Sequence, residues 1–185
     1  MAKIKDQSLY FIAVIPPDPI FQDAQELKEH FASVYDSKAS LNSPPHITLH
    51  MPFKLSDKKV EKLIKTLSDL STEHGSFELE FNGFKAFQPR VIFMSVTKQE
   101  RLNRLQKSVQ TAMKTKLNVF NANYQERPFH PHLTLAFRDL KKDKFEVAWQ
   151  EFKEKKYHKT FMVKNFCLLK HDGKRWEVFQ SFFLG

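Results

Sequence analysis

The sequence is poor in cysteine and glycine, and these shortages exclude several kinds of site. Its 185 residues contain one cysteine, Cys167, so no disulfide can form within the chain. Apolar neighbours surround this residue in the sequence, which favours a buried thiol over a nucleophile. Four glycines do not supply a glycine-rich loop, so a backbone cradle for phosphate is not expected. Any phosphate must therefore be bound by side chains.

Long hydrophobic runs are also missing. No stretch approaches the roughly 18 to 20 apolar residues that span a bilayer, and the first seven residues are too polar to begin a signal peptide. Hydrophobic residues still make up 41% of the chain, which is enough for the core of one compact domain. We therefore expect a soluble, cytoplasmic monomer that does not act at a membrane.

Positive charge is abundant but unevenly distributed. Residues 1–97 carry 11 Lys and Arg against 12 Asp and Glu, whereas residues 98–185 carry 19 against 9. The densest group of lysines includes Lys141, Lys142 and Lys144. A basic surface on one side suits a polyanion such as RNA. The same lysines are equally consistent with the solvated face of a helix, and both interpretations stay open.

Two similar segments lie about half a chain apart. Residues 45–49 read Pro-His-Ile-Thr-Leu, and residues 131–135 read Pro-His-Leu-Thr-Leu. Repetition of one five-residue pattern indicates an internal duplication. Each segment is rich in strand-forming residues and begins at a proline, which favours extended backbone before it.

In a strand, side chains two positions apart project from the same face. His46 and Thr48 therefore share a face, and so do His132 and Thr134. Imidazoles titrate near neutral pH, so two of them across a cleft can accept a proton from an attacking oxygen and give one to a leaving oxygen. The threonine hydroxyls can donate hydrogen bonds to the non-bridging oxygens of a phosphate.

The order of elements also repeats. A strand, a helix, a motif strand, a second helix and a further strand are predicted before residue 88, and the same order follows it. The predicted helices have apolar stripes that begin near Ile20, Val60, Leu102 and Phe145. We expect an α+β fold with two pseudo-symmetric lobes of antiparallel sheet, outer helices and a central cleft. The lobes, about 1–88 and 89–185, are expected to pack intimately as a single domain over 1–185.

The paired motifs resemble those of the two-histidine (2H) phosphoesterase superfamily, in particular its 2′-5′ RNA ligase and cyclic phosphodiesterase branch. The resemblance extends to the apolar strand over 89–96 and to the ending over 168–184, so it covers nearly the whole chain. It implies a phosphodiesterase that acts on 2′,3′-cyclic phosphate or on 2′-5′-linked RNA ends, with reversible 2′-5′ ligation as a variant. His46 and His132 are then the catalytic acid-base pair, and Thr48 and Thr134 bind the phosphate.

Four further residues are candidate substrate contacts: Arg90, His130, Tyr124 and Arg138. The resemblance favours an arginine at the position of Arg90, although a surface arginine at a strand edge fits equally well. Many relatives carry arginine one position before Arg138, where this chain has Phe137. The side chain of Tyr124 is suited to stacking on a base. Strand alternation predicts that His50 and His130 line the mouth of the cleft.

A metal site is the main chemical rival. His130 and His132 have a spacing that permits chelation on a strand, but His46 and His50 would be about 13 Å apart. Neither a cysteine cluster nor an HExxH helix supplies more ligands. We therefore expect no metal and no cofactor, and a partner that is an RNA end or a nucleotide with a cyclic phosphate. The alternative function is an RNA-binding module with little or no catalysis.

Overall fold

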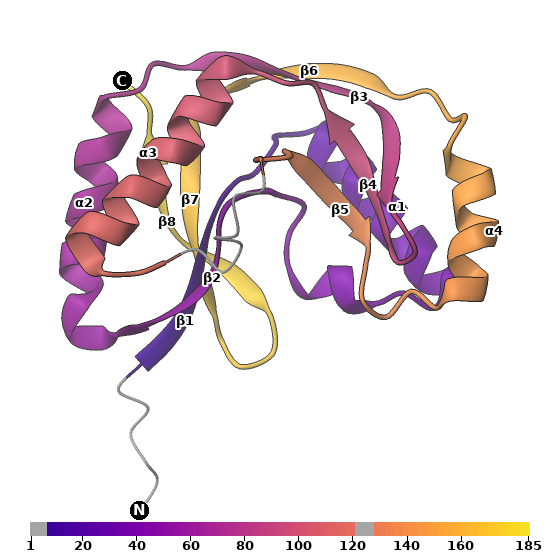
Figure 1. Ribbon diagram of the computed structural model, residues 1–185, viewed down its shortest axis with the longest axis horizontal. Coiled ribbons are helices and arrows are strands. Elements are labelled where there is room, and N and C mark those ends of the chain that lie inside the picture. Colours follow the sequence, from indigo (N-terminus) through magenta and orange to yellow (C-terminus); the bar gives the residue numbers. More distant parts are fainter. Residues whose placement is uncertain (1–6, 121–127) are drawn as a thin grey trace, which may run out of the picture.

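The computed structural model describes residues 7–120 and 128–185, which form eight strands and four α-helices (Figure 1). The strands are β1 (Gln7–Val14), β2 (Ile47–Ser56), β3 (Phe77–Phe87), β4 (Val91–Val96), β5 (His132–Ala136), β6 (His158–Val163), β7 (Asn165–His171) and β8 (Trp176–Phe183). The helices are α1 (Ile20–Tyr35), α2 (Val60–Thr72), α3 (Glu100–Leu117) and α4 (Lys142–Phe152), with short 3₁₀ helices η1 (Ala39–Asn42) and η2 (Asp57–Lys59).

Each α-helix buries one stripe of side chains, as its sequence predicts. In α1 the buried apolar residues are Ile20, Ala24, Phe31 and Tyr35, at the spacing that puts residues on one helix face. Lys28 is buried in the same stripe, where an apolar residue is the usual occupant. Among the described residues, no helix combines the length and apolar character needed to cross a membrane.

All eight strands belong to one antiparallel sheet with the order β6-β3-β4-β5-β2-β1-β7-β8. The motif strands β2 and β5 are neighbours at its centre, joined through the pair of Ile47 and Leu133. By contrast, β1 pairs with β2 and β4 with β5 along most of their lengths. The sheet therefore consists of two halves of four strands, related by an approximate twofold arrangement. This is the expected α+β fold with two pseudo-symmetric lobes.

The two halves of the sheet are not the two halves of the chain. The expected lobes, 1–88 and 89–185, would each keep their own strands, but β3 pairs with β4 and β7 pairs with β1. Only three residues, 88–90, separate β3 from β4. This short connection makes a local hairpin, which draws β3 into the half that contains the second motif. A lobe boundary near residue 88 therefore does not hold.

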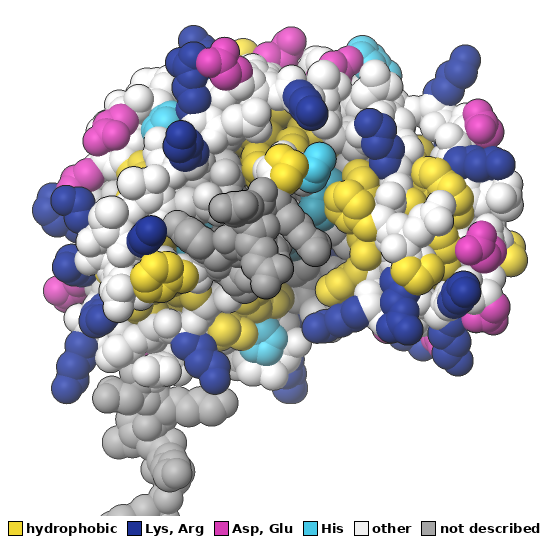
Figure 2. All heavy atoms as spheres, in the orientation of Figure 1, with side chains coloured by type: hydrophobic (Ala, Val, Ile, Leu, Met, Phe, Trp, Pro, Cys, Tyr) yellow, Lys and Arg dark blue, Asp and Glu magenta, His cyan; other side chains and the backbone are white. Residues whose placement is uncertain are grey.

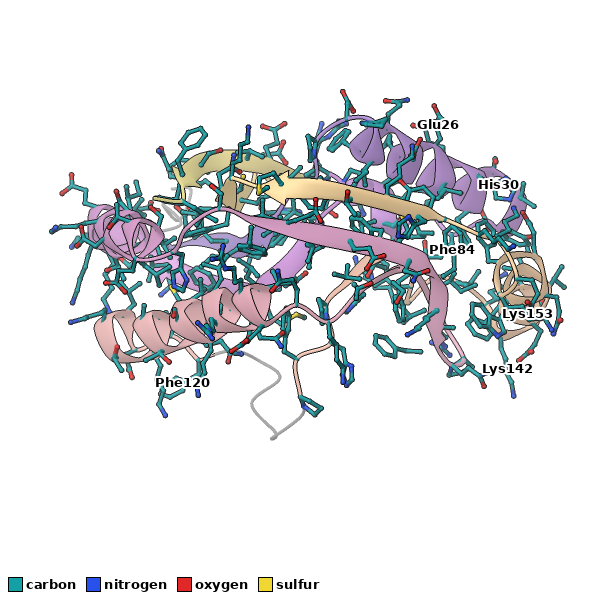
Figure 3. The ribbon with its side chains drawn as sticks, turned by 90° about the horizontal axis from the view of Figure 1, so that it is seen from above. Glu26, His30, Phe84, Phe120, Lys142 and Lys153 are labelled. Atoms are coloured by element: carbon teal, nitrogen blue, oxygen red, sulfur yellow. The ribbon has the colours of Figure 1, made fainter. Side chains whose placement is uncertain are left out.

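The helices α1 and α3 each pack against the half of the sheet that does not contain the two strands they connect. Although α1 connects β1 to β2, it packs against β5, and α3, which connects β4 to β5, packs against β2. Figure 1 shows α2 and α3 at one end of the molecule and α1 and α4 at the other. Figure 3 shows His30 on α1 facing α4, where its Nε2 lies 3.3 Å from the carboxylate of Glu151. The exchange interlocks the two halves.

The two faces of the sheet carry different apolar clusters. Tyr10 and Ile12 of β1 belong to the large cluster that includes the buried helix residues. Phe11 and Ala13 alternate with them and belong to a smaller cluster with Cys167. Burial raises the pKa of the Cys167 thiol, as expected for a core cysteine. The smaller cluster lies on the face that carries the first motif, because Ala13 pairs with Thr48.

Candidate active site

The pairing of the motif strands brings both His-x-Thr motifs together. Because β2 and β5 are antiparallel and Ile47 pairs with Leu133, their register sets His46 opposite Thr134 and Thr48 opposite His132. All four side chains are half-buried. His46 and His132 are then diagonal neighbours on one face, and such residues are roughly 7–8 Å apart in an antiparallel sheet. The register therefore sets both motif histidines on the same face of the sheet.

Each motif histidine is anchored in the same way. The distance from His46 Nδ1 to the carbonyl oxygen of Pro44 is 2.7 Å, and that from His132 Nδ1 to the carbonyl oxygen of His130 is 2.6 Å. A carbonyl oxygen only accepts a hydrogen bond, so each Nδ1 must carry the proton. Each neutral imidazole therefore presents an unprotonated Nε2. The two motifs therefore share the tautomer of their histidine as well as their sequence pattern.

Aromatic rings support both imidazoles from the neighbouring strands. The ring of Phe11 on β1 is 4.7 Å from that of His46, and the ring of Phe93 on β4 is 4.9 Å from that of His132. Phe87, at the end of β3, meets His132 edge to face at 5.2 Å and is 43% exposed. These contacts hold the orientation of the imidazoles and leave one ring, that of Phe87, accessible beside His132.

Burial makes both histidines weak bases in the free protein. It lowers the pKa of His46 to about 4, and the nearby positive charges of Lys28 and His132 act in the same direction. The hydrogen bond to Pro44 opposes this shift. Burial also lowers the pKa of His132, against its bond to His130. Both imidazoles are therefore mainly neutral at pH 7.

A groove of about 370 Å³ lies beside the first motif. It is bordered by Gln25, Leu41, Asn42, Ser43, Pro44, Arg175, Trp176, Glu177 and Val178. The ring of Trp176 is 4.6 Å from that of Phe11, which itself contacts His46. Figure 2 shows histidine and hydrophobic side chains gathered around the middle of one face of the molecule. An aromatic ring therefore stands near each motif histidine, Trp176 on one side and Phe87 on the other.

The four candidate contacts have different positions. Arg90 is exposed in the turn between β3 and β4, where its N–H donates to the carbonyl of Phe87. His130 is exposed, and its ring is 6.5 Å from that of Phe87. Arg138 is exposed beyond the second motif, with its guanidinium 5.0 Å from the centre of the Phe137 ring. Tyr124 lies outside the described residues.

His50 does not line the cleft, contrary to the expectation from strand alternation. It is 1% exposed, its Nδ1 is 2.9 Å from the carbonyl oxygen of Met51, and its ring meets Phe53 of the large cluster edge to face. The register of β1 and β2 shifts between Ala13 and Ile12, so that His50 pairs with Ile12 instead of continuing the alternation from Thr48. An irregularity of this kind reverses the direction of the following side chains.

Three residues of the site were not found from the sequence: Lys28, Phe87 and Trp176. Lys28 had a signal, since it occupies the apolar stripe of a predicted helix. Phe87 and Trp176 had no such signal. The sequence contains 19 phenylalanines and two tryptophans, and it does not show which of them lie near the motifs until the pairing of the strands is known. Among residues 7–120 and 128–185, no group of three or more His, Cys, Asp or Glu side chains is arranged to hold a metal ion.

Comparison with known proteins identifies relatives that match nearly the whole chain. A protein of Oceanobacillus iheyensis is 30% identical over 181 residues, covering 95% of this chain and 98% of the relative. A protein of Geobacillus sp. strain WCH70 is 28% identical over 179 residues, covering 95% and 96%. Both carry the name "putative phosphoesterase".

Solved structures share the fold. The crystal structure of Escherichia coli LigT with 3′-AMP has a TM-score of 0.69 at 19% identity, covering 96% of this chain and 98% of that one. The protein TT0787 of Thermus thermophilus has a TM-score of 0.67 at 20% identity, covering 95% and 97%. The sequence model of the 2′-5′ RNA ligase superfamily matches residues 16–175. With nearly its whole length accounted for in this way, the chain belongs to the 2′-5′ RNA ligase superfamily.

Proposed function

We propose that this protein is a metal-independent phosphodiesterase that acts on 2′,3′-cyclic phosphate or on 2′-5′-linked RNA ends. Reversible 2′-5′ ligation is a variant of the same chemistry. In this proposal His46 and His132 are the acid-base pair, and Thr48 and Thr134 bind the non-bridging oxygens. The observation that carries it is the matched anchoring of the two imidazoles through Nδ1, which leaves both Nε2 atoms free.

The separation of the histidines supports one shared phosphorus. In an in-line displacement the entering and leaving oxygens lie on opposite sides of the phosphorus, and each requires its own proton carrier. Diagonal neighbours about 7–8 Å apart leave room for a phosphate between their Nε2 atoms. Each threonine lies opposite the histidine of the other motif in the register of β2 and β5. Both hydroxyls can therefore donate to a phosphate held between the two imidazoles.

The surroundings of the histidines support a nucleoside as the rest of the substrate. Phe87 is exposed beside His132, and Trp176 borders the groove beside His46. Aromatic side chains stack on bases of either RNA or a mononucleotide. LigT of Escherichia coli, which shares the fold, has been crystallised with 3′-AMP and with ATP. These observations support nucleotides as the substrate class.

The decisive experiment is turnover by the purified protein of a panel of substrates. The panel contains a 2′,3′-cyclic nucleotide, a 2′-5′-linked dinucleotide, a 3′-5′-linked dinucleotide and an RNA with a cyclic phosphate end. We expect hydrolysis of the cyclic phosphate or of the 2′-5′ linkage, and no hydrolysis of the 3′-5′ linkage. Absence of turnover across the panel would reject the proposed function.

The alternative is an RNA-binding module with little or no catalysis. The observation that favours it is the excess of 19 Lys and Arg over 9 Asp and Glu in residues 98–185. Retention of RNA by the protein, without change to any end over many hours, would support this second function. Hydrolysis abolished in His46→Ala would instead support the enzyme.

A further inference from the structure

Asp139 lies in a turn directly after the second motif. β5 ends at Ala136, and a hydrogen bond of 2.8 Å from the Leu140 N–H to the Phe137 carbonyl closes the turn. Leu140 is 1% exposed and belongs to the large apolar cluster, so it anchors the turn in the core. The half-buried carboxylate of Asp139 is therefore held at a defined position beyond the end of the motif strand.

The partners of this carboxylate lie 100 to 102 residues earlier in the chain. Its Oδ1 accepts a hydrogen bond from Ser37 Oγ at 2.9 Å, and its Oδ2 accepts from the backbone N–H groups of Lys38 and Ala39, both at 2.7 Å. Hydrogen bonds to a carboxylate are among the stronger kinds. Three of them hold the start of η1 against the turn after β5, and Figure 1 shows these parts of the chain side by side.

The segment held in this way forms one wall of the groove beside the first motif. This loop wall consists of residues 41–44, which follow the residues bound by Asp139. At its far end, Lys28 is 1% exposed, and its Nζ donates to the carbonyl of Ser43 at 2.5 Å. The loop wall is therefore held at one end by Asp139, which follows the strand of the second motif, and at the other by Lys28 of α1.

The opposite wall of the groove is the hairpin of β7 and β8. This hairpin wall consists of residues 175–178 and includes the ring of Trp176. In the loop wall, Leu41 is apolar and 37% exposed. A space between an aromatic ring and an aliphatic side chain suits a planar base, which stacks on the ring. The groove volume of about 370 Å³ is within the range of small-ligand sites, roughly 300–1,000 Å³.

The two aromatic rings near the site differ in how they reach the motif histidines. Phe87 contacts His132 directly, with ring centres 5.2 Å apart. Trp176 contacts Phe11, and Phe11 in turn contacts His46. The ring of Phe87 is therefore the nearer one for a nucleoside whose phosphate lies between the histidines. The groove beside Trp176 remains for a part of the substrate further from that phosphate.

We propose that the groove binds the second nucleoside of a substrate longer than one nucleotide, and that Asp139 is a positioning residue that sets the separation of its two walls. This inference rests on the proposed function. Asp139 acts through the loop wall and does not itself touch the substrate. The half of the sheet that carries the second motif thus shapes the groove beside the first. A mononucleotide does not reach the groove, so its binding is independent of Asp139.

Two variants separate the geometry of this contact from its charge. Asp139→Ala removes all three hydrogen bonds. Asp139→Asn preserves their geometry, because its amide oxygen can accept from both backbone N–H groups while its NH₂ group donates to Ser37 Oγ. We expect Asp139→Ala to bind a dinucleotide about 5-fold or more weakly, the loss that follows when one base no longer stacks. Asp139→Asn should bind it within about 2-fold of the wild-type protein, since the loop wall stays in place.

Calorimetric titration with two unreactive probes provides the measurement. The probes are 3′-AMP and a 3′-5′-linked dinucleotide, and the affinity for 3′-AMP should be the same in all variants. Adding Asp139→Ala to Trp176→Ala should weaken the dinucleotide no further than Trp176→Ala alone, because both changes remove the same stacking contact. In turnover, Asp139→Ala should raise KM for a 2′-5′-linked dinucleotide without changing kcat or the KM for a cyclic mononucleotide.

Asp23→Ala is the matched control. Asp23 is also a half-buried carboxylate, and it accepts from Tyr157 Oη at 2.7 Å and from Lys159 Nζ at 2.5 Å, neither of which borders the groove. Urea unfolding should show a loss of stability in both alanine variants, whereas the affinity for the dinucleotide should fall only in Asp139→Ala.

Two results would overturn the inference. Equal weakening of both probes in Asp139→Ala, or unchanged binding of both, would leave Asp139 with a purely structural role. A wild-type protein that binds the dinucleotide no more tightly than 3′-AMP would show that the groove is not a nucleoside site. If the wild-type protein turns over no substrate, the proposed function fails, while the ratio of the two affinities still decides whether Asp139 shapes the groove.

Discussion

His46 and His132 are 86 residues apart in the chain, yet the pairing of Ile47 with Leu133 makes them diagonal neighbours on adjacent strands. Each imidazole donates its Nδ1 proton to the carbonyl two residues before it. The two Nε2 atoms are therefore presented by the same local structure, repeated on the two halves of one sheet.

Replacement of either motif histidine should abolish most of the activity. We expect His46→Ala and His132→Ala each to reduce kcat by at least about 10²-fold, because general acid-base catalysis commonly contributes that much. Thr48→Ala and Thr134→Ala should cost less. His158, which is exposed on β6 and pairs with Glu80, provides the control, since His158→Ala should retain full activity. Near-normal turnover in either motif variant would remove the paired-histidine mechanism.

Chelation should leave the activity intact. The proposed chemistry transfers protons between imidazoles and oxygens and assigns no step to a metal, so activity should survive exhaustive treatment with EDTA. The rate should also depend on pH as a bell-shaped curve, because one histidine must be neutral and the other protonated. Loss of activity on chelation, restored by zinc or manganese, would favour the metal mechanism instead.

Phe87 and Trp176 should contribute to the binding of different substrates. Phe87→Ala is expected to raise KM for a 2′,3′-cyclic mononucleotide by about 5-fold or more, because loss of stacking costs roughly 1–3 kcal/mol per base. Trp176→Ala should leave that KM nearly unchanged but raise it for a 2′-5′-linked dinucleotide. Steady-state kinetics with both substrates provide the measurement. The reverse pattern for the mononucleotide would place its nucleoside beside His46 instead of beside His132.

Lys28 should make stability depend on pH above neutrality. The folded-state pKa of about 8 is below the ordinary value of 10.5, so below pH 8 the native state carries a charge that burial disfavours. As pH rises from 8 to 10.5, the unfolded chain holds more protons than the native state, and the free energy of unfolding should rise. At 1.36 kcal/mol per unit of pKa, the full rise is about 3 kcal/mol.

Lys28→Met should remove that rise. Urea unfolding of the variant and the wild-type protein at pH 7 and pH 10.5 measures it as a difference between the two proteins, which cancels the titration of other groups. The variant also loses the hydrogen bond from the Lys28 ammonium to the carbonyl of Ser43, and such a charged hydrogen bond contributes about 1.5–3 kcal/mol. Equal pH dependence in both proteins would show that Lys28 is solvated in the native state.

The lysines of α4 should matter only for longer RNA. Lys141 and Lys142 are exposed and Lys144 is half-buried at the start of α4, and Figure 3 shows Lys142 at the outer surface. If they contact the RNA backbone, their simultaneous replacement by Glu should weaken oligonucleotide binding and reduce its salt dependence. Turnover of a mononucleotide should be unaffected. Replacing the exposed Lys58, Lys59 and Lys62 by Glu is the matched control, and an equal effect of both triple variants would identify the α4 lysines as an ordinary solvated face.

The local features of the protein follow from its sequence alone. Alternation placed His46 with Thr48, and His132 with Thr134, because side chains two positions apart in a strand share a face whatever the strand pairs with. Apolar spacing likewise determined the four helices, since a helix that buries one face needs that period. The repeat of the two motifs indicated a fold with two related halves. These properties depend only on neighbours in the chain.

Features that depend on residues far apart in the chain could be seen only in the folded structure. The irregular pairing of β1 with β2 turned His50 into the core, although strand alternation favoured the cleft. The hairpin of β3 and β4 carried β3 across to the second motif and set Phe87 against His132. The burial of Lys28 depends on the packing of α1 against β5 and against η1. Such outcomes depend on which surfaces pack together when the chain folds. The spacing of residues within one segment does not indicate which other segment will cover it.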